Sequence, residues 1–497
     1  MTGGWSTRWW EKRWAVGAAM IAATIPLWLV RLAPQIDLLG HIGRYHLQLV
    51  AADNRLLAAN WAVHWRWIGN LGGDLLMMIL GPMFGVEAGA RILSGLILML
   101  MVSGMARLAI AAHGRLPATA WAAFPFAMAY PWHYGLVNYW LGIALALHAA
   151  ASFWRRAASG RTVAAIGIAS LLLWTVHIFG WAVFATIMAA RRLTSAGYRE
   201  RRASLVLLAA LATPVVVMAV QRYGADGHAA ATLGWFRLGY KLSALSWTLR
   251  DQNQGFDLAC LGSALLLIAA GNVSAAFARD RALLLAAFLL AAFVVLLPYQ
   301  LFGSAFADGR LWPVALILAL LAIAPRERHA RLDAGIALVA GLLFLLRIGM
   351  TAIGFVAYDA AYTHHLKALD LVPRGSRIAV LVDFQCKPPW RRERLEHLDG
   401  IAIVRRDAFT NGQWEVPGAQ LVAPLGARGT PFNSDPSELS FNCGDPIGAL
   451  GRRLATLPRD RFDYVWLLAY PPASLPPMRG LSPMFADDRT ILYRIDR

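Results

Sequence analysis

Long apolar runs recur along the first three quarters of the chain, and they constrain its fold more than any other feature. A membrane-crossing helix needs about 20 mostly apolar residues. Eleven stretches approach this description, and they lie near residues 14–32, 88–112, 118–131, 136–154, 163–176, 178–190, 203–220, 257–277, 282–302, 311–324 and 332–356. With 58% hydrophobic and only 15% charged residues, the chain is predicted to be a polytopic α-helical membrane protein with about 11 transmembrane helices.

The net charge of +18 could suggest a nucleic-acid-binding protein, but its distribution argues against this class. Residues 1–357 hold 29 Lys and Arg against 13 Asp and Glu, whereas residues 358–497 hold 18 against 16. The excess therefore lies in short loops between apolar runs. Such a distribution is typical of signals that orient a membrane protein, so no nucleic-acid partner is expected.

The basic residues also predict which side each loop occupies. With the N-terminus inside, the inner segments carry 18 basic and 5 acidic residues, while the outer segments within 33–310 carry 8 of each. Cytoplasmic loops are enriched in Lys and Arg. We therefore expect a cytoplasmic N-terminus, two long outer loops at 33–87 and 221–256, and an outer C-terminal region. The basic clusters on both sides of 163–190 favour a hairpin of two short helices that turns near His177.

The outer loops and the C-terminal region carry their own patterns. The segment "DLLGHIGRYHLQLVAADNRLLAANW" has apolar residues at helical spacing, which predicts a helix lying on the membrane surface. Residues 358–497 contain short runs of strand length, "RIAVLVDF", "IAIVRR", "YVWLLAY" and "TILYRID", and predict a small extracytoplasmic α/β domain. Cys386 and Cys443 lie in this domain, and the sequence leaves open whether they pair or remain free thiols.

Candidate functional residues gather where the first apolar run ends, in "PQIDLLGHIGRYH". Asp37 and His41 are four residues apart and share a helix face. Their spacing fits a general base with its neighbour, and equally a solvated acid at a helix N-terminus. Arg44 and Tyr45 follow in the same stretch and are candidates for substrate contacts. A carboxyl group of ordinary pKa, about 4, would leave Asp37 ionised at neutral pH.

Two further features lie near the predicted outer face. Arg310, in "FADGRLWPVALILALLA", could hold a lipid phosphate or could pair with Asp308. Histidines that could converge on a metal or an anion are His41, His46, His64, His133 and His177. The sequence contains no P-loop, glycine-rich dinucleotide turn, CxxC pair or HExxH motif. The sequence motifs therefore identify no metal ligands and no certain cofactor. Whether a divalent metal ion binds stays open.

The chain resembles the GT-C glycosyltransferases, integral-membrane enzymes that use polyprenyl-phosphate sugars, over most of 14–356. The resemblance rests on a first helix followed by a large outer loop that opens with an acid, and on "MFGVEAGARILSGLILML", "GRLWPVALILALLA" and "DLLGHIGRYHL" with "GLVNYWLGIALAL". The first two segments are similar to those of the bacterial aminoarabinose and O-mannosyl transferase branch. The resemblance implies a GT-C-like fold in a bacterial inner membrane with a periplasmic C-terminal domain.

The resemblance also implies an activity and two site residues. Asp37 matches the catalytic acid of the family, which deprotonates the acceptor hydroxyl in an inverting displacement. Arg310 matches the arginine near the phosphate of the donor. To these we add His41 as a catalytic residue and His177 as a substrate contact, from their expected positions alone. The implied partners are a polyprenyl-phosphate-linked sugar and membrane lipids, whereas the donor sugar and the acceptor are not readable.

Two other functions stay open at this stage. A polysaccharide polymerase or ligase would also join lipid-linked sugars at the outer face. A transporter or envelope scaffold would be non-catalytic. Transporters tend to place ionisable residues at mid-membrane and to contain internal repeats. Here the notable charges lie at one face and no repeat is visible, which favours an enzyme.

Overall fold

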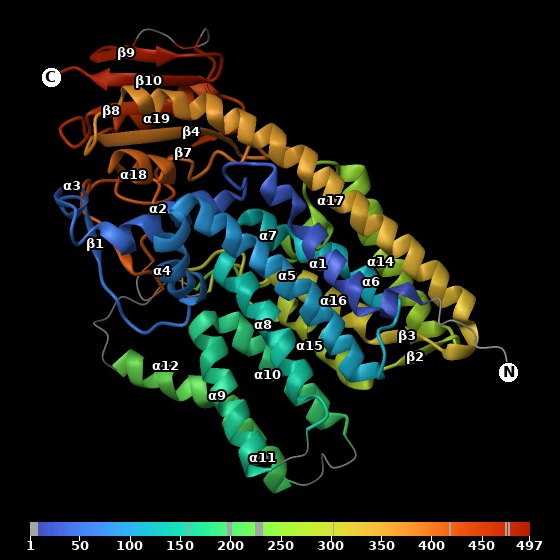
Figure 1. The fold of residues 1–497 in the computed structure, drawn as a ribbon. Coiled ribbons are helices and arrows are strands. Elements are labelled where there is room, and N and C mark those ends of the chain that lie inside the picture. The colour runs from blue at the N-terminus through green and yellow to red at the C-terminus, as the bar shows by residue number, and fades with distance from the viewer. Residues whose placement is uncertain are drawn as a thin grey trace.

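In the computed structural model, a bundle of apolar helices carries a mixed α/β layer at one end (Figure 1). The structure describes residues 8–156, 159–195, 201–223, 232–301, 303–416, 419–472, 475 and 478–497. The N-terminus lies at the end of the bundle far from the sheet, and the long helix α17 (Ala330–Leu366) runs from that end up to the sheet (Figure 1).

Each predicted apolar crossing coincides with one helix or with two consecutive helices. These are α1 (Arg13–Trp28), α5 (Val86–His113), α6 (Thr119–Ala123) with η2 (Phe124–Met128), α8 (Val137–Phe153), α9 (Gly160–Val176), α10 (Ile178–Leu193), α11 (Arg201–Leu211) with α12 (Thr213–Tyr223), α14 (Gln254–Val273), α15 (Arg281–Leu296), α16 (Trp312–Leu321) and α17. Among the described residues, three helices are long and apolar enough to cross a membrane, or four if the bent pair α11–α12 counts as one. The count of eleven crossings therefore stays a prediction.

Short elements connect these helices. They are η1 (Trp9–Glu11), α3 (Arg55–Ala58), α7 (Tyr130–Tyr134), α13 (Leu238–Ser246), η3 (Trp247–Leu249), η4 (Gly309–Leu311), η5 (Glu327–His329), η6 (Lys367–Leu371), and the paired strands β2 (Phe277–Arg279) and β3 (Ile323–Pro325).

The segments predicted to face the cytoplasm lie together at one end of the bundle. Arg115 forms ion pairs with Glu11, at 3.1 Å, and with Asp333, at 2.8 Å, which joins three of them. Strands β2 and β3 join a fourth segment, around 277–281, to the segment that holds Asp333. The hairpin at His177 is confirmed, because α9 ends at Val176, α10 begins at Ile178, and the return brings Arg191 Nε to within 3.4 Å of the Trp154 carbonyl oxygen.

Most of the segment predicted as the first outer loop, 33–87, is structured. It forms α2 (Ile36–Val50), α3, β1 (Trp61–Val63) and α4 (Gly72–Phe84). The helix predicted from its apolar spacing is therefore confirmed as α2. Ten of its fifteen residues are buried beneath other elements, and its position at a membrane surface stays a prediction. Part of the segment predicted as the second outer loop, 221–256, likewise forms a helix, α13.

A six-stranded mixed sheet forms the core of the C-terminal region. Its strands are β4 (Arg377–Gln385), β5 (Phe409–Thr410), β7 (Leu439–Asn442), β8 (Tyr464–Leu468), β9 (Leu481–Ala486) and β10 (Thr490–Ile495). Strand β4 pairs in parallel with β5, β7 and β8, and β10 is antiparallel to both β8 and β9. Three of the four predicted strands are confirmed as β4, β8 and β10.

The fourth prediction was wrong, because "IAIVRR" forms helix α18 (Gly400–Arg406) and not a strand. A short apolar run fits either structure, and burial against a neighbour decides between them. Here the neighbour is α2. A second helix, α19 (Pro446–Ala455), follows β7. Cys386 and Cys443 are joined in a disulfide that links the residues just after β4 and β7.

Helices α2 and α18 hold the two parts of the molecule together. A Cβ atom on Gly400 would lie 2.2 Å from the Leu39 carbonyl oxygen, and one on Gly43 would lie 2.9 Å from the Gly400 carbonyl oxygen. The two backbones therefore meet at a distance that only glycine allows. Beside them, β1 pairs with β6 (Val422–Pro424) in an antiparallel ladder. This contact fixes the position of α2, and of Asp37 at its N-terminus, relative to the C-terminal sheet.

Candidate functional site

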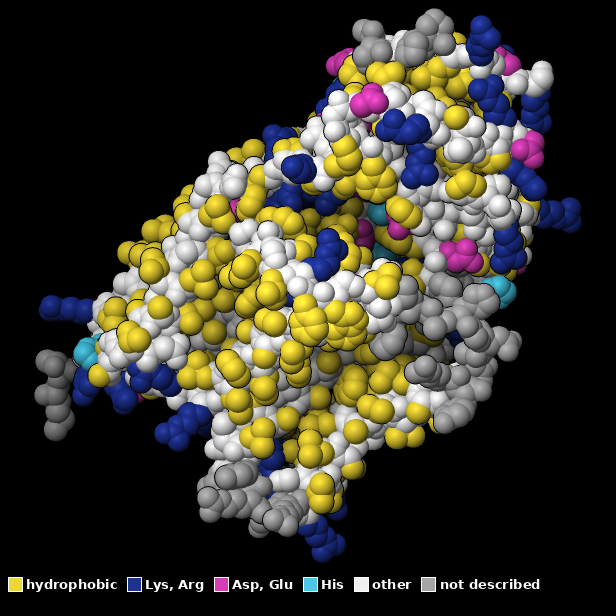
Figure 2. Space-filling view, turned by 180° about the vertical axis from the view of Figure 1, so that it is seen from behind, with side chains coloured by type: hydrophobic (Ala, Val, Ile, Leu, Met, Phe, Trp, Pro, Cys, Tyr) yellow, Lys and Arg dark blue, Asp and Glu magenta, His cyan; other side chains and the backbone are white. Residues whose placement is uncertain are grey.

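Charged and histidine side chains gather in a hollow on one face of the molecule, among predominantly hydrophobic neighbours (Figure 2). The contacts described below join such side chains around the N-terminus of α2. Helix α2 begins after the extended residue Gln35 and carries Asp37 in its first turn, where the helix dipole favours a negative charge. Gly135, with φ +88°, packs on the same turn, and a Cβ atom there would lie 3.0 Å from the Asp37 amide nitrogen.

Asp37 faces a histidine that the sequence did not single out. Its Oδ1 lies 4.0 Å from Nε2 of His397, and its side chain is 13% exposed, which leaves it accessible. The same histidine nitrogen lies 3.8 Å from Oδ1 of Asp435. On the other edge of the ring, Nδ1 of His397 lies 3.0 Å from the Gly412 carbonyl oxygen and 3.5 Å from Oε1 of Glu438.

The surroundings of these groups shift their titration. Burial raises the pKa of Asp37 from its ordinary 3.8 to about 7, although the facing His397 opposes the rise. The expectation that Asp37 has an ordinary pKa was therefore wrong, because the side chain has lost most of its water. Burial disfavours the charge of His397, yet the carboxylates of Asp435 and Asp37 outweigh it and raise the pKa of the imidazole. Burial also raises the pKa of Glu438 well above its ordinary value.

Arg310 is buried, and its positive charge lowers the pKa of Asp37. The alternative that Arg310 pairs with Asp308 was wrong, because Asp308 accepts a 2.7 Å hydrogen bond from Nζ of Lys241. The guanidinium group instead donates to the Phe306 carbonyl oxygen at 3.1 Å and to the Ser304 hydroxyl at 3.2 Å. Arg310 therefore also stabilises the turn that precedes α16.

The other predicted residues divide into two groups. His177 lies near Arg310, since the Arg310 guanidinium lies over the rings of Tyr139, at 5.4 Å, and Phe179, at 5.7 Å, and both rings contact the His177 ring. His41 lies near His397, because the Trp414 ring contacts both, at 5.0 Å and 4.2 Å between ring centroids.

Arg44 and Tyr45 belong to a different, fully buried layer. Arg44 pairs with Asp74 at 3.1 Å and donates a 2.7 Å hydrogen bond to Gln420. The Tyr45 hydroxyl is buried, and a Cβ atom on Gly73 would lie 2.7 Å from it. The structure therefore gives both residues packing and tethering contacts between α2, α4 and the C-terminal region.

The five histidines considered as one cluster do not converge. His133 lies 3.5 Å from Asp251, whereas His46 lies 3.6 Å from Asp407. His64 is exposed. The histidine that does face Asp37 is His397, which lies in the C-terminal region outside the predicted cluster.

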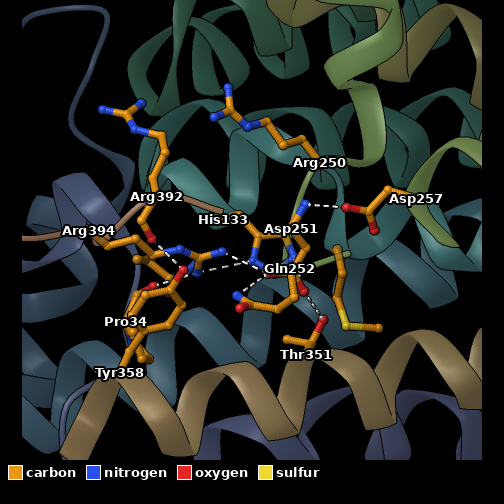
Figure 3. A network of polar contacts seen from close by, with 12 residues as sticks. Pro34, His133, Arg250, Asp251, Gln252, Asp257, Thr351, Tyr358, Arg392 and Arg394 are labelled. Atoms are coloured by element: carbon orange, nitrogen blue, oxygen red, sulfur yellow. Dashed lines mark hydrogen bonds and ion pairs between the residues drawn. The ribbon is translucent and has the colours of Figure 1, made fainter. Parts of the chain in front are cut away.

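A buried polar network holds the segment that carries His397 against the helices (Figure 3). Asp251 accepts a 2.7 Å hydrogen bond from Arg394, lies 3.5 Å from His133, and accepts a 2.8 Å bond from Thr351. Arg394 also donates to the Pro34 carbonyl oxygen at 2.7 Å. Because Pro34 lies two residues before α2, Arg394 joins the segment that leads to Asp37 to the segment that leads to His397.

Sequence reasoning missed His397, Asp435, Glu438 and Trp414. Their only signal is that they lie in polar turns, "RRERLEHLDG" and "NSDPSEL" among them, between the apolar runs of an α/β region. Within the described part of the chain, one group of three metal-ligating side chains occurs, and it consists of His397, Asp435 and Glu438.

No protein-family model matches the chain, and no curated protein matches it. Among solved structures, the chain is similar to ArnT from Cupriavidus metallidurans bound to undecaprenyl phosphate, with 12% sequence identity, a TM-score of 0.49, and 97% of each chain covered. It is also similar to the apo state of the same protein, with 14% identity, a TM-score of 0.47, and 96% of each chain covered. Similarity at this level assigns no activity and no site residue to the present chain.

Proposed function

We propose that the protein is a membrane glycosyltransferase that moves a sugar from a polyprenyl-phosphate donor to an envelope glycan, lipid or protein acceptor at the outer face of a bacterial inner membrane. The observation that carries the proposal is the placement of Asp37. This carboxyl group lies at the first turn of α2, just beyond the apolar helix α1, with 13% of its side chain exposed and the charge of Arg310 close by.

The placement suits a donor that cannot leave the bilayer. The sugar–phosphate bond of a lipid-linked donor lies near the headgroup plane, so a base must reach that depth from a rigid support. Helix α2 provides the support because α18 and the Gly135 turn fix it on two sides. Arg310 is held by the turn at 304–306 and would lie beside the phosphate of the donor, where a fixed cation stabilises developing negative charge.

The reaction that fits these groups is an inverting displacement. Asp37 takes the proton of the acceptor hydroxyl while the hydroxyl oxygen forms a bond to the anomeric carbon. The bond between that carbon and the phosphate oxygen breaks, and polyprenyl phosphate leaves with the electron pair. Arg310 neutralises the added charge on the phosphate. His41 contacts the Trp414 ring, which also packs on His397. His177 contacts the Tyr139 ring, over which the Arg310 guanidinium lies. Both histidines would orient these groups.

The decisive experiment compares the parent protein with Asp37→Asn and Asp53→Asn. Asp53 is an exposed acid in the same outer segment, so the second variant is a matched control. Purified proteins in detergent are given polyprenyl-phosphate sugars, and the release of polyprenyl phosphate is measured. Loss of a general base costs about 10²–10⁴-fold in rate, so Asp37→Asn should lose that much while Asp53→Asn keeps parental turnover. Equal turnover in all three proteins would reject Asp37 as the base.

A further inference from the structure

We propose that His397, Asp435 and Glu438 form a binding site for one divalent transition-metal cation, with Zn²⁺ or Mn²⁺ as its occupant. Each residue offers one ligand atom, and the three atoms lie within 4.8 Å of one another. Metal binding at this site requires only these three ligands and does not depend on the proposed glycosyl transfer.

The orientation of His397 is that of a metal ligand. Its Nδ1 lies 3.0 Å from the Gly412 carbonyl oxygen, which can only accept a hydrogen bond. The proton of a neutral ring therefore belongs on Nδ1, and the lone pair of Nε2 remains for a ligand. A histidine that binds a metal commonly donates its other ring N–H to a backbone carbonyl in this way.

The Gly412 carbonyl is itself held in place. The Gly412 amide donates a 3.1 Å hydrogen bond to Oδ2 of Asp399, and a Cβ atom on Gly412 would lie 2.5 Å from the same oxygen. The Trp414 ring, 4.2 Å from the His397 ring between centroids, packs on the imidazole. The donor nitrogen is thus fixed by two successive hydrogen bonds and one aromatic contact.

Glu438 supplies the second, independent observation. Its side chain is fully buried, and no N–H group or hydroxyl in the described part of the chain donates to either carboxyl oxygen, so that its one hydrogen-bond partner is the Asp435 carboxyl group when one of the two is protonated. Its Oε1 lies 3.5 Å from Nδ1 of His397, and the three candidate ligand atoms all lie within 4.8 Å of one another. An unsatisfied carboxyl group in such a place is costly. A cation coordinated by this group would remove that cost.

Asp435 completes the set and connects it with solvent. Its side chain is 26% exposed, and its Oδ1 lies 3.8 Å from Nε2 of His397. Ligand bonds of about 2.0–2.2 Å place two donor atoms on one ion about 3.0–4.4 Å apart, so this separation already fits. One imidazole with two carboxyl groups suits Zn²⁺ or Mn²⁺, whereas Ca²⁺ and Mg²⁺ prefer sites made only of oxygen.

The main alternative is a proton shared between the Asp435 and Glu438 carboxyl groups, with no metal. Both arrangements would satisfy the buried oxygens, but only one of them binds a metal ion. Asp37 approaches the same His397 nitrogen at 4.0 Å. A cation would therefore lie beside the proposed base, and a metal assay must be read without any donor or acceptor present.

The test measures metal directly. Full-length protein purified in detergent is stripped with EDTA and exchanged into metal-free buffer, and Zn²⁺ or Mn²⁺ is then titrated by calorimetry. Bound metal is counted by mass spectrometry after gel filtration. We expect about one ion per chain, and a higher thermal unfolding temperature with the ion than without it. His397→Ala and Glu438→Gln should each weaken binding by about 10-fold or more.

Two further variants keep the outcome interpretable. Asp435→Asn changes a partly exposed side chain, so it should preserve the fold and still weaken binding. His64→Ala removes an exposed histidine elsewhere and should bind like the parent. Absence of bound metal in the parent, equal binding in the parent and Asp435→Asn, or binding of Ca²⁺ and Mg²⁺ alone would each overturn the proposal. Because turnover is not measured, a negative result leaves the proposed glycosyl transfer to be judged by the Asp37→Asn experiment.

Discussion

The Asp37 carboxylate lies 4.0 Å from Nε2 of His397, although one residue follows the first apolar helix and the other belongs to the C-terminal region. Two backbone contacts produce this proximity. Gly400 follows His397 by less than one helical turn and lies against Leu39, and Arg394 binds the carbonyl of Pro34. The acid and the imidazole are therefore positioned by the junction of two regions, which makes the junction itself a target for experiments.

Replacing Gly400 by alanine should disturb that junction. The added Cβ atom would meet the Leu39 carbonyl oxygen at 2.2 Å, so α2 and α18 must separate. Overpacking typically costs about 1–3 kcal/mol, and we expect a lower thermal unfolding temperature. The matched control is Gly451→Ala in α19, where a new Cβ atom meets nothing within 4 Å and should be neutral or slightly stabilising. Equal unfolding temperatures for the two variants would contradict the tight contact.

Arg310→Lys should separate donor binding from folding. Lysine keeps the charge but loses the planar guanidinium, which binds phosphate through two parallel hydrogen bonds. We expect the KM for a polyprenyl-phosphate sugar to rise about 10-fold or more. Because Arg310 also holds the turn at 304–306, a small fall in unfolding temperature is expected as well. Arg237→Lys, at an exposed arginine that also lies over tyrosine rings, is the control; an unchanged KM in Arg310→Lys would exclude the role.

His46 should make the protein less stable in mild acid. Burial lowers the pKa of His46 below its ordinary 6.5, although the nearby Asp407 opposes this and Arg374 adds to it. Above pH 6.5 the folded and unfolded states both hold a neutral ring, so the shift has no effect there. As the pH falls below 6.5, the unfolded state binds the proton more readily, and stability falls. His46→Gln should lose less thermal stability than the parent between pH 7.5 and 5.5, and an identical loss would refute this.

The orientation in the membrane remains a prediction with a direct test. We expect the N-terminus in the cytoplasm and residues 358–497 in the periplasm, because inner segments hold 18 basic and 5 acidic residues while outer segments within 33–310 hold 8 of each. A reporter enzyme that works only in the periplasm, fused at residue 360, should be active. A reporter that works only in the cytoplasm should be silent there. The reverse pattern would invert the topology and remove the basis for an outer-face transferase.

The local sequence was sufficient wherever one short segment decides its own structure. The apolar runs predicted the positions of α1, α5, α6, α8 to α12 and α14 to α17, and the basic residues on both sides of 163–190 predicted the hairpin at His177, because charge and hydropathy act within a few residues. Strands β4, β8 and β10 were predicted from short apolar runs of strand length. By contrast, 401–406 was predicted as a strand and forms α18, since a run this short takes the structure that its neighbour buries.

The candidate site was predictable only in part. Sequence indicated Asp37 and Arg310 because each stands at the end of an apolar run, where a charge is unusual. It could not indicate His397, Asp435 or Glu438, which are ordinary polar residues of turns until the fold assembles them. The pKa of Asp37 near 7 likewise arises from burial in the folded protein. Periodicity and charge are read along the chain, whereas desolvation and ligand geometry depend on segments distant in sequence, and only the tertiary structure brings those together.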